Sequence, residues 1–242
     1  MEFVGYLYDG VEIITVEFMN KLNELRKKYA TFGIGVYTDR MFTQIYGRMP
    51  LRPYEEREKL ASAFKGVDFT FPVDSFECEI KKNQRKINEV EGTKLYHVGY
   101  APGTYDILHE GHLEHLSFCR RMCDILVVGV KTDKNVFETK GKKTYQEQEL
   151  RKTVIQNLEM VDYVIFVDTR DKRVANQEIQ RLVGSPIDVV FLGSDCMGQE
   201  NDQNPDNIRF IYTDRPEEVM KTRSSSFYRA ELEKIHKEAE KK

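Results

Sequence analysis

Residues 103–116 read GTYDILHEGHLEHL and follow an apolar run that ends at Tyr100. Three of the chain's five histidines lie in this stretch at intervals of three residues, namely His109, His112 and His115. At that spacing they share one face of a helix. The apolar run predicts a strand, the Gly-Thr pair predicts a turn, and the residues from about Gly111 predict a helix. The order strand, turn, helix indicates part of a βαβ unit.

The same alternation continues along the chain. Strands are predicted at residues 2–7, 33–38, 68–73, 95–100, 125–131, 163–167, 187–192 and 208–212. Helices are predicted at residues 15–29, 54–65, 111–122, 147–160, 174–183 and 225–241. This alternation predicts an α/β protein with a Rossmann-like arrangement of parallel sheets and crossover helices. Residues 77–93 are polar and lack strand character, so we expect a linker there.

The first part of the chain repeats in the second. The segment GVYTD at 35–39 matches GVKTD at 129–133, an offset of 94 residues (129 − 35), and Arg57 matches Arg151 at the same offset. The match needs no gap from residue 34 to residue 75. We interpret it as a duplication of a βαβ-type module. The first copy is expected to be truncated, because its chain enters the linker near residue 77.

The two copies differ around the histidines. The pair YD at 8–9 matches YD at 105–106, which predicts three extra residues in the second copy. In that alignment His109 meets Glu12 and His112 meets Thr15, while Lys140 meets Tyr46. The first copy then keeps the scaffold but lacks the loop, the histidines and the lysine. These residues are therefore expected to serve chemistry in the second copy.

Composition excludes several classes of protein. The net charge of −3 argues against a nucleic-acid partner, and no apolar run approaches the about 20 residues of a membrane span. The N-terminal residues lack a basic region followed by an apolar core, so no secretory signal is expected. The four cysteines form no C-x-x-C pair, which favours a reduced, cytoplasmic chain.

Three interpretations of the histidines compete. A zinc site would use His109, His112 and His115 with Cys119, but the helical zinc pattern H-E-x-x-H has a different spacing. A packing or capping role is favoured for His115. In a phosphate site, backbone N–H groups at the helix start would bind an anion, and the histidines would donate hydrogen bonds to it. Gly103 would let the backbone approach a phosphate closely.

A family resemblance favours the phosphate site. Residues 103–112 resemble the G-T-F-D-x-x-H-x-G-H signature of the cytidylyltransferase family, within the H-x-G-H nucleotidyltransferase superfamily. The resemblance extends over residues 95–232 and is strongest to the glycerol-3-phosphate enzymes. It also covers CDILVVGVKTD at 123–133, KGKKTYQEQELRK at 140–152 and IDVVFLGSD at 187–195. It implies a Rossmann-like fold and transfer of CMP from CTP to a phosphorylated alcohol.

The resemblance also implies residue roles. His109 and His112 would stabilise charge on the attacked α-phosphate, Lys140 would bind phosphate with Lys142 as a weaker candidate, and Arg151 would lie near the reacting phosphates. Arg57 persists in the first copy, so a structural role for Arg151 is open as well. Nucleotide binding is expected from Gly103, Thr104, Tyr105, Asp106, Gly111 and Asp195. Mg²⁺ would enter with the nucleotide, with no metal ligand assigned to the protein.

The last part of the resemblance is incomplete. The family has R-T-x-G-[IV]-S-T-T where this chain has TDRPEEVMKTRSSSFYRAEL at 213–232. Ser224, Ser225 and Ser226 fit the phosphate-binding position, although a serine there could equally cap the helix. The arginine could be Arg215 or Arg223. RSSSFYR also resembles the I-S-S-[ST]-x-x-R of adenylyltransferases, so ATP is the alternative nucleotide.

We therefore predict a catalytic domain at residues 94–242, preceded by a degenerate repeat at 1–76 and a linker at 77–93. The expected reaction uses CTP and a small phospho-alcohol such as glycerol 3-phosphate or phosphoethanolamine. The two repeats are expected to pair within one chain as a pseudo-dimer. The alternatives are an ATP-dependent adenylyltransferase and a catalytically silent nucleotide-binding or scaffold protein.

Overall fold

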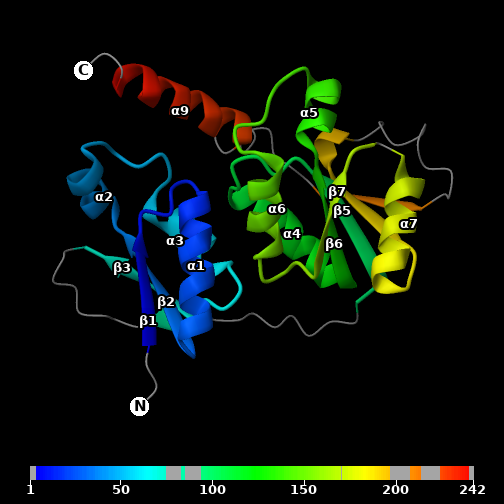
Figure 1. Cartoon of the computed structure of the whole chain (residues 1–242), viewed down its shortest axis with the longest axis horizontal. Helices are drawn as coiled ribbons and strands as arrows, with labels where there is room; N and C mark the ends of the chain where they lie inside the picture. The colour runs from blue at the N-terminus through cyan, green and yellow to red at the C-terminus, as the bar shows by residue number, and fades with distance from the viewer. Residues whose placement is uncertain are drawn as a thin grey trace. The chain divides into compact units, whose positions relative to one another are not determined.

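The computed structural model describes residues 4–74, 83–84, 94–169, 171–196, 208–213 and 224–239. The chain divides into two compact units, shown in Figure 1. The first unit comprises Met1–Glu89 with Glu231–Lys242, and the second comprises Val90–Ala230. The predicted roles of the domains, and the pairing of the repeats, stay predictions.

The second unit contains a five-stranded parallel sheet in the order β7-β6-β5-β8-β9. Its strands are β5 (Tyr96–Gly103), β6 (Cys123–Lys131), β7 (Tyr163–Val167), β8 (Val189–Gly193) and β9 (Arg209–Thr213). Crossover helices join them, so the predicted Rossmann-like α/β fold is confirmed. The strand order reverses beside β5. In open α/β sheets, such a reversal leaves a crevice at the carboxyl ends of the strands, where ligands bind.

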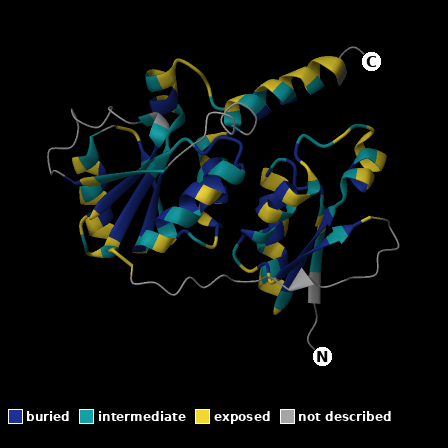
Figure 2. Cartoon of the chain, turned by 180° about the vertical axis from the view of Figure 1, so that it is seen from behind, coloured by how far each residue is buried: buried dark blue, intermediate teal, exposed yellow. Residues whose placement is uncertain are grey.

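Helices cover both faces of this sheet. They are α4 (Glu110–Met122), α6 (Gln148–Gln156) and α7 (Lys172–Val183). The chain also forms α5 (Asp133–Lys140), α9 (Ser225–Ala239) and a short 3-10 turn at Ser194–Cys196, and the boundary between the two units falls within α9. In Figure 1, α7 lies on one side of the strands and α4 and α6 lie on the other. Ala175 and Ile179 of α7 pack on strand residues such as Val98, Val127 and Val190. Figure 2 shows that these strands are largely buried.

The first unit contains a four-stranded sheet in the order β1-β2-β3-β4. Its strands are β1 (Val4–Asp9), β2 (Thr31–Tyr37), β3 (Phe69–Val73) and β4 (Asn83–Gln84), and its helices are α1 (Val16–Lys28), α2 (Asp39–Tyr46) and α3 (Tyr54–Ser62). Strands β1 to β3 are parallel, whereas β4 runs antiparallel to β3. Residues 77–93 were expected to lack strands, and this is wrong for Asn83–Gln84. These two residues pair with β3, whose edge has backbone groups available for hydrogen bonding.

Helices α2 and α5 were not expected from the sequence. Each has eight residues and starts directly after a strand, so neither shows a long apolar period. Thr38 and Thr132 cap them by accepting a hydrogen bond from the backbone N–H three residues later. Gly47 and Gly141 end them in the left-handed conformation, with φ of 67° and 65°. Threonine caps and C-terminal glycines, not hydrophobic periodicity, specify these two helices.

The expected three-residue insertion in the second copy is wrong. Strands β1 and β5 end at Asp9 and Gly103, and helices α1 and α4 begin at Val16 and Glu110, so both boundaries keep the offset of 94 residues. Val11 and Tyr105, also 94 apart, both have positive φ (49° and 54°). The matching YD letters are thus not structurally equivalent.

The corrected register also changes the partners of the histidines. His109 corresponds to Thr15, and His112 corresponds to Phe18. Glu12 corresponds to Asp106. The Glu12 carboxylate accepts the backbone N–H of Leu51, before α3, and the Asp106 carboxylate accepts that of Tyr145, before α6. A common origin of the two units stays a prediction.

No helix in the described parts of the chain is long and apolar enough to cross a membrane.

Candidate active site

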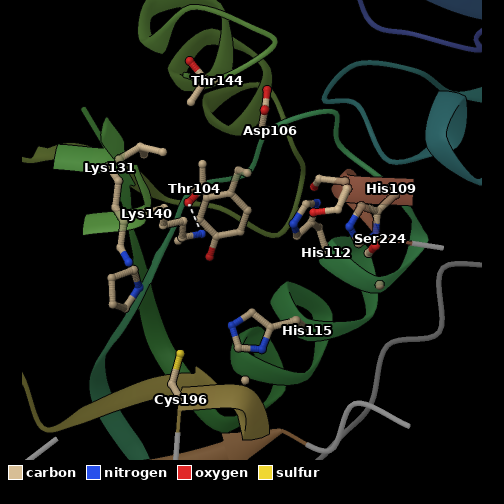
Figure 3. A pocket seen from close by; sticks show the side chains of 18 of the residues that line it. Thr104, Asp106, His109, His112, His115, Lys131, Lys140, Thr144, Cys196 and Ser224 are labelled. Atoms are coloured by element: carbon tan, nitrogen blue, oxygen red, sulfur yellow. Dashed lines mark hydrogen bonds between the residues drawn. The ribbon is translucent and has the colours of Figure 1, made fainter. Parts of the chain in front are cut away.

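A cavity of about 610 Å³ lies at the carboxyl ends of the strands of the second unit. The last residues of β5, β6, β8 and β9 line it, which places it at the reversal of strand order. Most residues predicted for the site also line it: Gly103, Thr104, Tyr105, Asp106, His109, Gly111, His112, Lys140, Lys142, Ser224, Ser225 and Ser226. Figure 3 shows how several of these side chains converge.

The turn after β5 is shaped by Tyr105. A Cβ on Gly103 would lie 2.6 Å from the Tyr105 ring, so only glycine leaves room for that ring. The Tyr105 hydroxyl donates to the Ala101 carbonyl at 3.1 Å, and the ring is buried. Gly103 is therefore required by packing within the turn. The prediction that it admits a phosphate stays a prediction.

The same turn is connected to the lysine-rich loop. The Asp106 carboxylate accepts the backbone N–H groups of Tyr145 and Gln146 at 2.8 and 2.9 Å. The Gln146 side chain accepts the N–H of Ile107, which is held at φ 53°. Such a conformation costs a β-branched residue about 1–3 kcal/mol and persists only where surrounding contacts impose it. These hydrogen bonds fix the position of the loop that carries the lysines.

His109 and His112 lie at the start of helix α4. Their rings stack with centroids 3.7 Å apart at an angle of 26°, and both residues are buried. His109 is the N-cap residue, and its side chain makes no capping hydrogen bond. A Cβ on Gly111 would lie 3.2 Å from the His109 ring, so the absence of a side chain at Gly111 leaves room for the ring in this position. The two imidazoles thus stand beside the positive end of the helix dipole.

Positive charge dominates the cavity. Within the described part of the chain, five cationic side chains line it, whereas two carboxylates do, Asp106 and Glu114. The cations are Lys131, Lys140, Lys142, Lys143 and Arg229. The whole chain has a net charge of −3, so this concentration is local. Such a cavity attracts anions.

Two of these lysines connect separate parts of the wall. Lys140 Nζ donates to Thr104 Oγ1 at 3.0 Å, and Lys142 Nζ donates to Ser226 Oγ at 3.3 Å. Ser224 Oγ accepts the N–H of Phe227 at 3.2 Å, so Ser224 caps helix α9, as the capping alternative proposed. A second helix N-terminus therefore lines the same cavity as that of α4, with Ser225 and Ser226 in its first turn.

Residues 100–236 match the family described as "Cytidylyltransferase-like", which is more than half of the chain. The chain belongs to the cytidylyltransferase-like family. Glycerol-3-phosphate cytidylyltransferase of Staphylococcus aureus (strain NCTC 8325 / PS 47) is 35% identical over 121 residues, covering 50% of this chain and 86% of that protein. The Bacillus subtilis (strain 168) protein of the same name is 32% identical over 121 residues, covering 50% and 88%.

Bifunctional protein HldE of Campylobacter concisus (strain 13826) is 30% identical over 148 residues, covering 61% of this chain and 29% of that protein. The chain thus spans less than a third of HldE. Together with the family match, these relatives support assignment of the chain as a nucleotidyltransferase.

Arg151 does not line the cavity of this cytidylyltransferase-like unit. Its fully buried guanidinium donates to the carbonyls of Gln146, Thr104 and Lys131 at 2.7 to 2.9 Å, and pairs with the Asp133 carboxylate. These bonds join the turn after β5, the end of β6 and the start of α6. The geometry gives Arg151 a positioning role, and contact with a phosphate stays a prediction.

Several cavity residues were not expected from the sequence. Lys131, Lys143, His115, Thr213, Cys196 and Arg229 all line it. Lys131 is the variable residue of the G-V-x-T-D segment and the last residue of β6. Its place at the carboxyl end of a predicted strand could have identified it as a cavity residue. Arg215 and Arg223 lie outside the described residues, as does the side chain of Asp195. Among the residues that the structure describes, no group of three or more His, Cys, Asp or Glu side chains is placed to hold a metal ion.

Proposed function

We propose that the second unit transfers CMP from CTP to a small phosphorylated alcohol, such as glycerol 3-phosphate or phosphoethanolamine. A phosphate oxygen of the acceptor forms a bond to the α-phosphorus of CTP. The bond from that phosphorus to the bridging oxygen breaks, and pyrophosphate leaves. The observation that carries the proposal is the stacked histidine pair at a helix N-terminus, inside a cavity lined by cationic side chains.

His109 and His112 donate hydrogen bonds to the α-phosphate as negative charge develops on it. Transfer of a phosphoryl group asks mainly for positioning and electrostatic stabilisation. The burial of both rings lowers the local dielectric constant and strengthens those hydrogen bonds. Gly111 keeps the His109 ring in place, so the pair is organised before the substrate arrives.

Lys140 and Lys142 bind the remaining phosphates of the triphosphate. Lys140 ends α5 and Lys142 lies in the following loop, which Asp106 fixes, and each reaches a hydroxyl on another part of the wall. A phosphate in the cavity would take the place of these hydroxyls as the acceptor, because a charge-assisted hydrogen bond is stronger than a neutral one. Lys131, Lys143 and Arg229 supply further charge for the phosphate of the second substrate.

Magnesium is expected to enter with the nucleotide and to neutralise charge on its phosphates. Mg²⁺ usually keeps several waters and binds through phosphate oxygens and one or two carboxylates. The Asp106 carboxylate already accepts two backbone N–H groups, which makes it a poor ligand. The donor set of the cavity therefore fits a metal held mainly by the triphosphate.

An ATP-dependent adenylyltransferase is the second candidate. The observation that favours it is the S-S-S-F-Y-R segment, because its three serines and Arg229 line the cavity. The acceptor would again be a phosphorylated compound, since the positive charge of the cavity is unchanged.

Pyrophosphate release tests the two candidates. The full chain is incubated with Mg²⁺, with CTP or ATP, and with each member of a panel of phospho-alcohols. Release with CTP and one acceptor supports the proposal, whereas release with ATP alone supports the second candidate. No release with either nucleotide, in a folded protein, would contradict both.

A further inference from the structure

His115 lies one helical turn beyond His112 and lines the same cavity. The sequence favoured a packing role for this histidine. In the structure its Nδ1 lies 2.8 Å from the hydroxyl oxygen of Thr213, the last residue of β9. Figure 3 shows the His115 ring and Cys196 toward one edge of the cavity, away from Asp106 and Thr144.

The hydrogen bonds define where the protons lie. The Thr213 hydroxyl donates to the Leu192 carbonyl at 3.2 Å, so its oxygen accepts from Nδ1–H of His115. Nε2 of the ring lies 3.8 Å from Cys119 Sγ. Burial raises the pKa of the Cys119 thiol, which therefore stays protonated and points a weak donor at Nε2. In this network Nδ1–H of His115 is the group that donates to Thr213.

This network joins elements on both sides of the sheet's reversal. His115 belongs to α4, the helix that follows β5, whereas Leu192 and Thr213 belong to β8 and β9. Strand β8 pairs with β5 on the side opposite β6. His115 therefore fixes the distance between the helix that carries His112 and the β8–β9 wall of the cavity.

The first unit, whose described strands include no counterpart of β8 and β9, has no histidine at this position of its helix α1. The residue 94 positions earlier is Lys21, on the exposed face of α1, where it pairs with Glu24. The position of Cys119 is taken by Leu25, a buried apolar residue. A helix of the same length thus forms there without a histidine at this site.

We propose that His115 is a positioning residue that holds the β8–β9 wall against the nucleoside part of the nucleotide; this inference rests on the proposed function. The lysines proposed for the triphosphate, Lys140 and Lys142, come from the end of α5 and from the loop after it, on one side of β5. The uncharged nucleoside then extends to the other side. Phe118, Leu192 and Cys196 line that side, and largely apolar walls suit such a ligand.

The test compares His115→Leu with His115→Asn. The Leu variant removes the donor to Thr213 and is expected to raise KM for CTP about tenfold, which corresponds to about 1.4 kcal/mol, with kcat nearly unchanged. An asparagine amide can replace Nδ1–H as the donor, so the Asn variant should recover most of the affinity. Lys21→Leu, at the matching position of the first unit, should change neither constant.

A double-mutant cycle with Thr213→Val tests whether the two residues act together. Residues joined by a hydrogen bond show non-additive effects, so the double variant should bind CTP about as weakly as His115→Leu alone. Additive losses, an unchanged KM in His115→Leu, or a loss confined to kcat would overturn the proposal. If His115→Leu does not fold, CTP affinity is measured in His115→Asn and in Thr213→Val. Weaker binding in Thr213→Val with near-normal binding in His115→Asn supports the proposal, and any other result overturns it.

Isothermal titration with CTP keeps this inference distinct from the proposed function. If the wild-type chain binds CTP but releases no pyrophosphate with any acceptor, the proposed reaction fails while the affinities still test His115. If the wild-type chain binds ATP and not CTP, the same variants are measured with ATP. Wild-type affinity in His115→Leu would overturn the inference whatever the reaction is.

Discussion

Thr15 begins helix α1 and His109 begins helix α4, 94 residues later, and the two N-caps are built differently. The Thr15 hydroxyl accepts the N–H of Phe18, which stabilises the helix start. The His109 side chain makes no such bond, and its ring stacks instead on His112, the counterpart of Phe18. The second unit thus presents two imidazoles where the first has a cap and a core residue. Such a difference is expected where a site serves chemistry rather than stability.

The buried arginines, in contrast, are the same in both units. Arg57 donates to the carbonyls of Arg52, Gly10 and Tyr37 and pairs with Asp39. Each partner lies 94 residues before the corresponding partner of Arg151. The comparison indicates that this arginine holds the scaffold in both units, whether or not a phosphate binds nearby.

Side chains fill the corresponding space of the first unit. The Phe42 ring lies 2.8 Å from where a Cβ on Gly10 would be, and Tyr46 packs on Phe42 with centroids 4.4 Å apart. Tyr46 stands at the position of Lys140. Arg48, at the position of Lys142, pairs with the buried Glu12. Aromatic rings and a neutralised arginine therefore replace the cationic wall of the second unit.

The largest effect is expected from the arginines. Arg57→Met and Arg151→Met should each destabilise its unit by about 3 kcal/mol, near the low end for breaking a buried ion pair because each carboxylate is partly exposed. Urea unfolding, monitored for each unit, measures this. A variant Arg151→Met of normal stability without turnover would show that Arg151 contacts the substrate, and the parallel with Arg57 would fail.

The histidines come next. His109→Ala and His112→Ala should each lower kcat about 10²–10³-fold, the usual cost of removing one donor from a developing charge. Their unfolding midpoints should change little. Thr15→Ala, the matched control, should cost about 1 kcal/mol of stability and leave the rate unchanged. Near-normal rates in both histidine variants would mean that the cavity is not the active site.

A smaller effect is expected from the lysine. Lys140→Ala should weaken CTP binding about 10- to 100-fold, because a hydrogen bond to a charged group contributes about 1.5–3 kcal/mol. Tyr46→Lys should create no second binding site, since Phe42 still fills the space beside it. Isothermal titration measures both variants. Unchanged affinity in Lys140→Ala would count against its role on the triphosphate.

The smallest effect concerns pH. Burial raises the pKa of Asp133, but hydrogen bonds from Arg151, Thr144 and the N–H of Gln148 outweigh it and hold the pKa below its usual value. A depressed pKa stabilises the fold above the unfolded value of about 3.9, and this contribution is lost as the pH falls through the folded value. The free energy of unfolding should therefore fall less in Asp133→Asn than in the wild-type chain as the pH is lowered from about 5 to about 3. An unchanged acid profile in urea unfolding would contradict this.

Local patterns predicted the elements that have a long period or a strong motif. Strand β7 and the start of α9 agree with the prediction to the residue. The signature predicted Thr104, His109 and His112 as site residues, because residues that are neighbours in sequence stay close together in the fold. The YD pairs led to a wrong alignment of the two units around the histidines. The residue that corresponds to Asp106 is Glu12, and each of these two carboxylates accepts a backbone N–H from a distant loop.

The remaining site residues could not be predicted from local patterns. Lys131 and Thr213 end two strands that the order of strands brings to the same edge of the sheet, and Arg229 lines the cavity from helix α9. His115 satisfies a helical period whether it packs or lines a cavity, so spacing alone does not distinguish these roles. Its hydrogen bond to Thr213 spans 98 positions of the chain, and no sequence motif records it.

We propose that the chain carries one nucleotide site, in the second unit, and that the first unit shares its scaffold without the site. Isothermal titration of the full chain with a non-hydrolysable CTP analogue and Mg²⁺ tests this most directly. We expect one bound nucleotide per chain, with binding weakened by Lys140→Ala and unaffected by Tyr46→Ala. Two bound nucleotides per chain, or a single site that is weakened by Tyr46→Ala and not by Lys140→Ala, would contradict it.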